Sequence, residues 1–249
     1  MTAAPELAPP FRLIAYDQIG STNDEAKRLA EAGAEHGTVV WAAEQTAGRG
    51  RRGRHWHSPR GNLHSSFLLF PRCPLHEAAQ LGFVTAVALR EALSEICPVG
   101  RFECKWPNDV LCDGLKVAGI LLETAGHADW MVVGVGVNVV AAPDPALYPA
   151  TCLRGVGCPA TAGDVLAALC RNLAVWYDTW RMRGFAPVRE AWLAGACGLG
   201  RPAEARLADG EVVKGIFAGL DAGGALLLTS ADGGQRSVLA GDVFFAGGR

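Results

Sequence analysis

The sequence predicts an α/β fold of the α+β type, a mixed β-sheet with flanking helices, followed by a small all-β module. Two observations carry this prediction. Up to about residue 193, short apolar runs rich in β-branched residues are interspersed with long stretches of helical periodicity. After Gly198 the chain changes to short strands separated by glycine-rich turns. The 249 residues, 50% of them hydrophobic, are enough for one large domain and one small one.

The composition suggests three segments. Residues 1–10 contain three prolines and should form a flexible tail. Residues 11–197 should form the large domain, and residues 198–249 a module of about five strands that favours a small β-barrel. The N-terminus lacks the basic start and apolar run of a signal peptide, and no 18-residue apolar stretch predicts a membrane span.

The expected elements follow from hydrophobic periodicity and from turn residues. A first helix should begin near Ser21 and end at Gly33, because Thr22 and Glu25 have the spacing of a capping box. The other helices are expected over 75–96, 161–183 and 185–193. Strands are expected over 11–16, 38–44, 63–70, 102–106 and 130–139, with a hairpin over 110–124 that turns at Asp113-Gly114 and a proline-rich loop over 141–159.

The most distinctive stretch is residues 47–62, which read A-G-R-G-R-R-G-R-H-W-H-S-P-R-G-N. Glycine lets backbone N–H groups approach a ligand, and arginine offers cationic forks for carboxylate or phosphate. Three interpretations stay open: a solvated basic loop, a nucleic-acid patch, or a small-molecule phosphate site. A dinucleotide fingerprint is rejected, because no helix begins here and the next acidic residue is Glu77.

Charge and cysteine usage narrow the class of protein. The net charge is −2, so the positive charge is local rather than spread over the whole surface, which counts against a dedicated nucleic-acid binder. The eight cysteines form no C-x-x-C pair and lie in apolar segments. They indicate reduced thiols in a cytoplasmic protein rather than a disulfide framework or a zinc site.

Several polar residues have both a structural and a functional interpretation. Ser21 and Thr22 either cap the first helix or, with its N-terminal N–H groups, face a polar ligand. Lys105, at the end of a strand, either forms a salt bridge with Glu103 or Asp109 or points its charge at an anion. Lys116 lies in a largely apolar strand, and is either exposed there or part of the same site. Glycines in the strand at 134–138 suggest close approach of a ligand or of another backbone.

These residues together describe a site for several negative charges without an evident nucleophile. The P-loop and G-x-S-x-G patterns are missing from the sequence. His55 and His57 lack metal-ligand spacing and a carboxylate partner set, so no protein metal site is expected. The chemistry that fits is attack of a substrate carboxylate on a nucleotide α-phosphate, in which positioning and charge neutralisation supply the catalysis.

Five motifs, in order, resemble those of the biotin–protein ligases. They are Ser21-Thr22-Asn23, Gly48–Gly53 (G-R-G-R-R-G), Lys105–Asp109 (K-W-P-N-D), Lys116–Leu121 (K-V-A-G-I-L) and Gly134–Asn138 (G-V-G-V-N). The resemblance covers residues 11 to about 193. It implies a catalytic domain similar to class II synthetases, and the small module is similar to the family's SH3-like C-terminal domain.

The resemblance implies ATP-dependent formation of biotinyl-5′-AMP, with Mg²⁺ carried by the nucleotide, and transfer of biotin to a lysine of a biotin carboxyl carrier protein. Lys105 and Arg51 would be catalytic. The implied biotin-binding residues are Ser21, Thr22, Asn23, Gln45, Arg49, Gly50, Arg51 and Lys105. The implied nucleotide-binding residues are Arg51, Trp56, Lys116 and Asn138.

Two features depart from the family pattern. About ten residues precede the first strand, too few for a DNA-binding helix-turn-helix domain, so no operator binding is expected. His64 stands where an aromatic residue, commonly tyrosine, is expected.

The rival functions are a lipoate–protein ligase, against which the arginine-rich loop counts, and a nucleic-acid-binding module. The sequence does not decide whether the protein is a homodimer.

Overall fold

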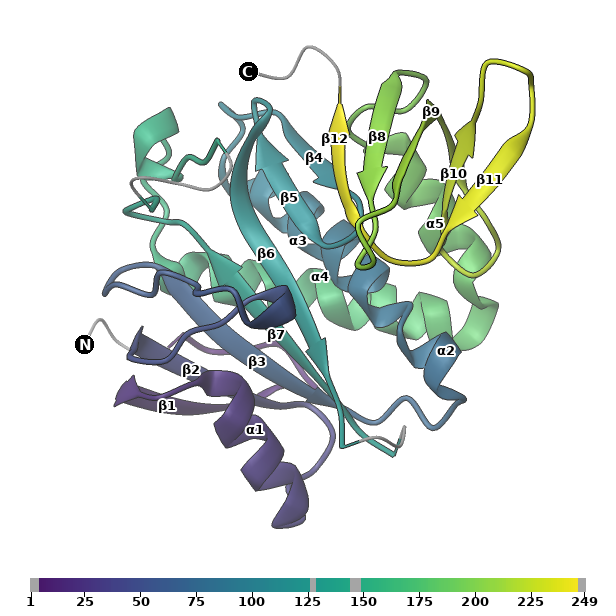
Figure 1. The fold of residues 1–249 in the computed structure, drawn as a ribbon. Coiled ribbons are helices and arrows are strands. Elements are labelled where there is room, and N and C mark those ends of the chain that lie inside the picture. Colours follow the sequence, from purple (N-terminus) through teal and green to yellow (C-terminus); the bar gives the residue numbers. More distant parts are fainter. Residues whose placement is uncertain (1–4, 126–128, 144–148, 246–249) are drawn as a thin grey trace.

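The computed structural model describes residues 5–125, 129–143 and 149–245, and Figure 1 shows its two parts, a large mixed sheet with helices and a smaller sheet beside it. The strands are β1 (Arg12–Ile19), β2 (Thr38–Gln45), β3 (Leu63–Leu69), β4 (Phe102–Lys105), β5 (Asp109–Cys112), β6 (Leu115–Glu123), β7 (Met131–Val137), β8 (Pro202–Arg206), β9 (Val212–Leu220), β10 (Leu226–Thr229), β11 (Gln235–Val238) and β12 (Asp242–Phe245). The α-helices are α1 (Thr22–Glu31), α2 (Leu75–Ala78), α3 (Leu81–Ile96), α4 (Ala162–Arg183) and α5 (Phe185–Ala194), with 3₁₀ turns η1 (Arg51–Gly53) and η2 (Arg154–Val156).

The large sheet confirms the predicted mixed topology. Its order is β1-β2-β3-β7-β6-β5-β4, in which β1 and β2 are parallel and the other neighbours are antiparallel. The connection from β1 to the parallel β2 runs through α1, as a crossover helix must. This topology brings the N-terminus of α1, the loop after β2 and the ends of β6 and β7 to one region of the sheet.

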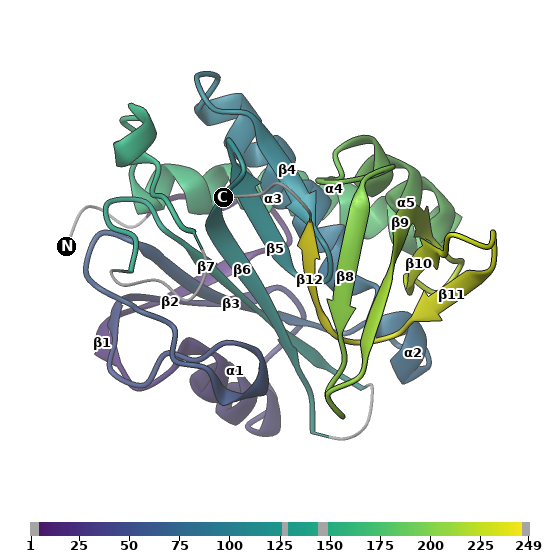
Figure 2. The same cartoon turned by 45° about the horizontal axis from the view of Figure 1, so that its top comes forward.

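Both faces of the sheet are covered, which explains why β3 is buried along its whole length. On one face, α3 and α4 pack on the sheet, and the main core lies between them, with Leu63, Phe67 and Leu69 of β3 facing it. On the other face, α1 packs on β2, β3 and β7, and a smaller core there includes Val40 and Leu68. Figure 2 shows α1 separated by the sheet from α3 and α4.

The C-terminal module is a five-stranded antiparallel sheet of order β11-β10-β9-β8-β12. Among the described residues this order has two edges, β11 and β12, so the ladder itself does not close into a ring. The module shares the main core, because Trp192 of α5 packs edge-to-face on Phe83 of α3 and against Phe217 of β9. Trp106 also donates from Nε1 to the carbonyl of Gly224 at 3.1 Å. These contacts hold the module beside the strand ends of the large sheet.

Two helical predictions were wrong in detail. The stretch 75–96 is not one helix: it is α2 followed by α3, because i→i+3 hydrogen bonds from Gly82 to Ala79 and from Phe83 to Gln80 tighten the chain there. The predicted capping box of Thr22 and Glu25 does not form. Ser21 is the N-cap of α1 and its hydroxyl accepts from the N–H of Asp24.

The remaining elements mostly follow the predictions. The hairpin of β5 and β6 turns at Asp113 and Gly114, both with positive φ, as a two-residue hairpin turn requires. Of the predicted flexible tail, residues 5–10 are described, and Leu7 packs on the main core; residues 1–4 lie outside the described range. Residues 144–148 of the predicted proline-rich loop and residues 246–249 of the C-terminal segment also lie outside it. All eight cysteines are free thiols.

Candidate active site

The N-terminus of α1 carries a network of uncharged polar groups. Thr22 donates from both its backbone N–H and its hydroxyl to Oε1 of Gln45, at 2.8 and 3.0 Å. Gln45, at the end of β2, donates from Nε2 to the hydroxyl of Ser58 at 3.0 Å. The hydroxyl of Ser66, on β3, lies 2.8 Å from that of Thr22 and 2.6 Å from Oδ1 of Asn23. Thr22, Asn23, Gln45 and Ser66 lie on helix or strand positions, and Ser58 is held in its loop by a hydrogen bond to the carbonyl of Trp56, so the network is preorganised.

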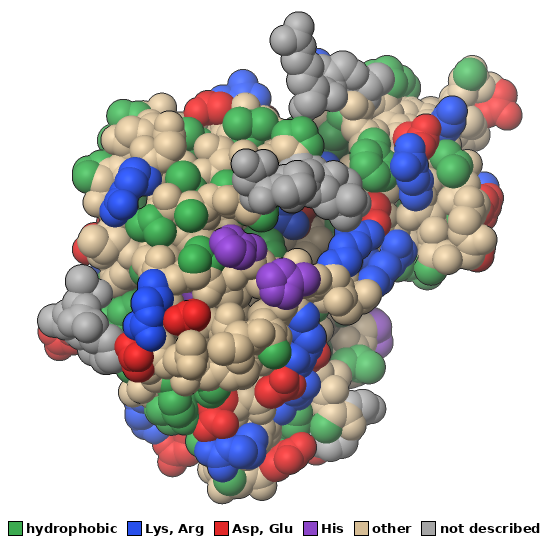
Figure 3. Space-filling model, turned by 60° about the vertical axis from the view of Figure 1, so that its left-hand side comes forward, with side chains coloured by type: hydrophobic (Ala, Val, Ile, Leu, Met, Phe, Trp, Pro, Cys, Tyr) green, Lys and Arg blue, Asp and Glu red, His purple; other side chains and the backbone are tan. Residues whose placement is uncertain are grey.

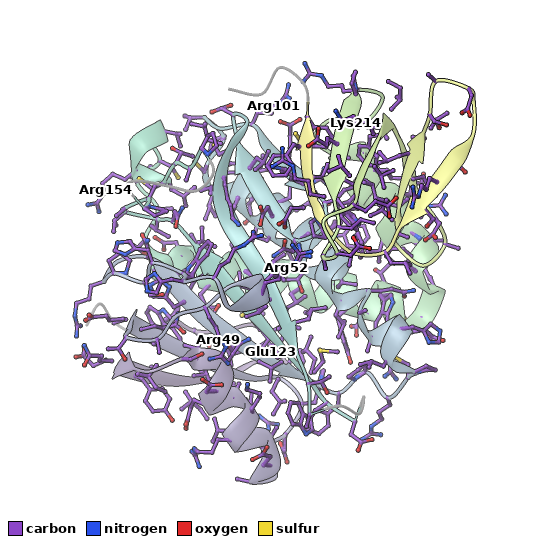
Figure 4. The ribbon with its side chains drawn as sticks, in the orientation of Figure 1. Arg49, Arg52, Arg101, Glu123, Arg154 and Lys214 are labelled. Atoms are coloured by element: carbon purple, nitrogen blue, oxygen red, sulfur yellow. The ribbon has the colours of Figure 1, made fainter. Side chains whose placement is uncertain are left out.

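The arginine loop after β2 is anchored to α1 at its first arginine. The guanidinium of Arg49 binds Asp24 through two hydrogen bonds of 2.5 and 2.6 Å, and it reaches Glu123 of β6 at 3.2 Å. Figure 4 shows Arg49 and Glu123 side by side in front of the sheet. The hydrogen bonds from Arg49 lower the pKa of the Asp24 carboxyl to about 2. Glu123 also accepts from Asn23 at 2.7 Å, which ties the loop to the uncharged network.

The floor of the site consists of glycines of β6 and β7 that leave room for larger groups. A Cβ on Gly136 would lie 2.5 Å from the indole of Trp56, and one on Gly119 would lie 3.1 Å from it. A Cβ on Gly134 would lie 2.3 Å from Oδ1 of Asn23. The predicted close approach therefore occurs, but the approaching groups are side chains rather than another backbone.

Two lysines line the cavity, and one of them contacts the indole. Nζ of Lys116 lies 5.4 Å from the ring centroid of Trp56 and 2.6 Å from Oδ1 of Asp109. The structural interpretation of Lys116 as an exposed strand residue is wrong, since its side chain is 23% exposed and is held by this pair. Nζ of Lys105 lies 5.9 Å from the ring of Phe244 on β12, at the border with the C-terminal module. Asn138 is buried and donates from Nδ2 to the carbonyl of Thr151 at 3.1 Å.

The rest of the arginine loop turns toward the C-terminal module. Arg51 donates to Oδ1 of Asn108 at 3.2 Å and to the carbonyl of Gly241 at 3.3 Å. Burial lowers the pKa of the Arg51 guanidinium, which still leaves it cationic at neutral pH. Asp242 of the module pairs with Arg52 and Arg54. In Figure 4, Arg52 lies between the large sheet and the module.

One cavity of about 350 Å³ gathers every site residue predicted from the sequence. Its lining includes Ser21, Thr22, Asn23, Gln45, Arg49, Gly50, Arg51, Trp56, Lys105, Lys116 and Asn138. The cavity opens on the face shown in Figure 3, where lysine and arginine side chains border a hollow with two histidines beside it. An uncharged polar end at α1 thus adjoins a cationic end near the C-terminal module, which suits a ligand with a polar uncharged head and an anionic tail.

Sequence reasoning missed the partners that hold these residues. They are Asp24, Ser58, Ser66, Asn108, Glu123 and Asp242, while Asp109 was considered only as a partner of Lys105 and not of Lys116. Asn108 and Asp109 stand inside the K-W-P-N-D motif, so the motif itself was a signal. Asp242 and Glu123 carried no local signal, because their partners lie far away along the chain.

His64 replaces the expected aromatic residue without disturbing the sheet. It is buried on β3, opposite Gly136, and its Nε2 lies 3.1 Å from the carbonyl of Pro59. Burial lowers the pKa of its imidazole, so the ring is neutral at pH 7. A neutral imidazole thus fills the position where an aromatic residue was expected, and its buried Nδ1 has no hydrogen-bond partner among the described residues.

Comparison with known proteins identifies the class. The profile of the biotin/lipoate A/B protein ligase family matches residues 15–138, and that of the biotin protein ligase C-terminal domain matches residues 198–246. The chain is 44% identical to the biotin–[acetyl-CoA-carboxylase] ligase of Paracoccus denitrificans, over 91% of this chain and 98% of that protein. The chain therefore belongs to the biotin–protein ligase family.

Two further relatives extend the match. The bifunctional ligase/repressor BirA of Bacillus subtilis is 35% identical over 89% of this chain and 70% of that protein. The biotin protein ligase of Aquifex aeolicus, solved in complex with biotin and ATP, superposes with a TM-score of 0.82 at 30% identity, covering 94% of this chain and 98% of that one. In the described part of the chain, every helix is too short or too polar to cross a bilayer.

Proposed function

We propose that this protein activates biotin with ATP as biotinyl-5′-AMP and transfers the biotinyl group to a lysine of a biotin carboxyl carrier protein. The observation that carries the proposal is the division of one cavity into an uncharged hydrogen-bonding end and a cationic end. Biotin has the same division, because its ureido head is polar and uncharged while its valerate tail ends in a carboxylate.

The head group would bind at the uncharged end. Ser21, Thr22 and Asn23 would face it from α1, and Gln45 from β2. Each is held by a neighbour in the structure, so little side-chain entropy is lost on binding. Arg49 and Gly50 would close over the head from the loop, with Arg49 held in place by Asp24.

The reaction itself would occur at the cationic end. An oxygen of the biotin carboxylate attacks the α-phosphorus of ATP, the bond from that phosphorus to the bridging oxygen breaks, and pyrophosphate leaves. Both reactants are anionic, so Arg51 and Lys105 would lower the barrier by neutralising charge at the reacting oxygens. Lys116, Trp56 and Asn138 would hold the nucleotide, the indole by stacking.

The acceptor lysine then completes the transfer. Its neutral ε-amine attacks the acyl carbon of the mixed anhydride, AMP leaves with the electron pair, and the amine loses a proton as the amide forms. A closed arginine loop would keep water from the anhydride until the acceptor arrives.

Mg²⁺ would accompany the nucleotide phosphates rather than reside in the protein. The two carboxylates that line the cavity, Asp109 and Asp242, are both bound by cationic side chains. Within the described ranges, no group of three histidine, cysteine or acidic residues has metal-binding geometry. These residues do not fit a resident metal, so no step is assigned to one.

The proposal extends to the setting of the reaction. The arginines of the loop are paired with Asp24 and Asp242, which leaves little of the basic footprint that DNA binding requires, so we expect no operator binding. The eight free thiols suit the reducing cytoplasm. A homodimer is a separate question, which sedimentation of the full chain would answer.

The direct test is ATP-dependent transfer of labelled biotin to a purified carrier domain. We expect labelled carrier and pyrophosphate in equal amounts, and no label on a carrier whose acceptor lysine is replaced by arginine. Isothermal titration with biotin and with lipoate runs in parallel. Tight lipoate binding without biotin binding would replace the proposal with lipoate ligation, and salt-sensitive DNA binding without either would replace it with nucleic-acid binding.

A further inference from the structure

The C-terminal module places one carboxylate against the arginine loop. Asp242 is the first residue of β12, and its side chain is 17% exposed. It accepts from Arg54, its tightest partner, and lies 3.4 Å from Arg52 and 3.8 Å from Arg51. Three guanidinium groups therefore converge on a single carboxylate, whose pKa they hold below its ordinary value against the opposing effect of burial.

The contact joins parts that are distant along the chain. Asp242 follows Arg54 by 188 residues, and the neighbouring carbonyl of Gly241 accepts from Arg51. On its other side, Arg51 donates to Asn108, whose Nδ2 is fixed by the carbonyl of Ile120 at 2.7 Å. Arg51 thus forms hydrogen bonds with both the large sheet and the module, and it lines the cationic end of the cavity.

Charge repulsion explains why the carboxylate is needed. Three like charges within one short loop repel one another, and partial burial strengthens that repulsion. Without Asp242, this repulsion would lack its nearest counter-charge. Asp242 offsets this repulsion mainly through Arg54 and Arg52, whose contacts with it are shorter than that of Arg51.

We propose that Asp242 is a positioning residue of the ligase reaction: through Arg54 and Arg52, the C-terminal module holds the arginine loop closed and so keeps Arg51 over the reacting phosphate. The proposal rests on the proposed function of the cavity. It differs from a role in which Asp242 competes with phosphate for Arg51. At 3.8 Å the Arg51 contact is the longest of the three, so a phosphate can bind Arg51 while Arg54 keeps the carboxylate.

The test uses the full chain with Asp242→Asn, which keeps the shape of the side chain and removes its charge. Glu204→Gln is the matched control, because Glu204 lies on the neighbouring strand β8 and pairs with Arg206 and Lys214 inside the module. Three quantities are measured: the KM for ATP, the rate at which free biotinyl-5′-AMP escapes in the absence of carrier, and the rate of trypsin cleavage after the loop arginines.

We expect Asp242→Asn to raise the KM for ATP and the escape rate by about 5- to 30-fold, the size of losing one partly exposed charge-assisted hydrogen bond. Trypsin should cleave the loop correspondingly faster, and the Glu204→Gln protein should match the parent in all three measurements. Asp242→Glu should recover part of the loss. Adding Arg54→Met to Asp242→Asn should change little further, because both substitutions remove the same contact.

Two results would overturn the proposal. If Asp242→Asn behaves like Glu204→Gln, the carboxylate holds nothing that matters to the reaction. If Asp242→Asn lowers the KM for ATP, the carboxylate competes with phosphate instead of positioning the loop. The trypsin measurement needs no activity, so it separates failure of this proposal from failure of the proposed function, which would appear as a parent protein unable to transfer biotin.

Discussion

The two ends of the cavity are built in different ways. At the α1 end, uncharged hydroxyl and amide groups are held by one another and by regular secondary structure, as in the contact of Thr22 with Gln45. At the other end, cationic groups are held by carboxylates, with Lys116 bound by Asp109 and the loop arginines bound by Asp242. Uncharged groups need only geometry, whereas clustered charges need counter-charges to stay in place.

The difference indicates a division of labour. A preorganised uncharged network gives selectivity, because a ligand that fails to match it leaves buried polar groups unpaired. Counter-ion pairs hold the cations ready for anions that bind only during the reaction. Changes at the uncharged end should therefore alter biotin affinity, and changes at the cationic end should alter the chemical step.

The largest effect is expected at the cationic end. Lys105→Ala removes the charge that we propose neutralises the reacting oxygens, and should slow pyrophosphate release by about 10²- to 10³-fold, the range for loss of one donor to developing charge. Biotin binding measured by calorimetry should change far less. Lys214→Ala, an exposed lysine of the module, is the control. Near-normal pyrophosphate release from the Lys105→Ala protein would contradict the assignment of the chemical step to the cationic end.

A glycine on the floor tests the position of the indole between the two ends. Gly136→Ala places a Cβ 2.5 Å from the Trp56 ring, so the ring must move and nucleotide turnover should fall by about 10²-fold through misplacement. Gly119→Ala meets the same ring at 3.1 Å and should cost less. Steady-state kinetics with ATP as the varied substrate measures both. If both variants turn over ATP as fast as the parent protein, the position of the Trp56 ring does not affect the reaction.

A substitution at the uncharged end should change the affinity for biotin and leave the KM for ATP nearly unchanged. Gln45→Ala removes the acceptor of the Thr22 N–H and hydroxyl, although Ser66 still donates to that hydroxyl and Ser58 still donates to the carbonyl of Trp56. The variant should weaken biotin binding by about 10-fold, the cost of leaving a buried donor unpaired. The KM for ATP should stay within about twofold, because Gln45 contacts no charged group at the other end. A larger change in the KM for ATP than in biotin affinity would contradict the separation of biotin binding and nucleotide binding between the two ends of the cavity.

The smallest effect concerns the pair of Asp24 and Arg49, which borders the uncharged end. The pKa of Asp24 is about 2 in the folded protein against an ordinary 3.8. This depressed pKa adds stability at neutral pH that disappears as the pH falls from about 3.8 toward 2. Because the Asp24 side chain is 53% exposed, solvent screening limits the contribution to about 0.5–1 kcal/mol.

Urea unfolding of the parent and of Asp24→Asn measures that contribution. The variant should be less stable at pH 7, and the difference should close between pH 3.8 and 2. Glu35→Gln, which removes one side of an exposed pair with Arg12, is the control for the loss of a surface carboxylate. A difference that stays constant down to pH 2 would mean that the stabilisation does not come from the Asp24 charge.

Much of the fold and all the predicted lining residues were readable from the sequence for a physical reason. Apolar runs marked the strands, a polar residue such as Gln45 marked a strand end, and glycines inside a strand, such as Gly136, marked a close approach. The break between α2 and α3 was not readable, because helical periodicity continues across Ala79 and Gln80, and only the tighter hydrogen bonds there interrupt it.

The partners of the cations were also beyond local reasoning. Glu123 follows Arg49 by 74 residues, and Asp242 follows Arg52 by 190. Which carboxylate meets which guanidinium depends on the sheet order and on the docking of the module, both of which are long-range. Asp109 shows the same limit at shorter range. The sequence suggested it as a partner of Lys105, whereas in the structure it binds Lys116.

The most direct measurement of the two-ended cavity is a crystal structure of the full chain with a non-hydrolysable analogue of biotinyl-5′-AMP. The ureido ring should lie against Thr22 and Gln45, and the phosphate should lie within hydrogen-bond distance of Arg51 or Lys105. A ureido ring bound beside Lys105, with the phosphate at the end of α1, would contradict the account.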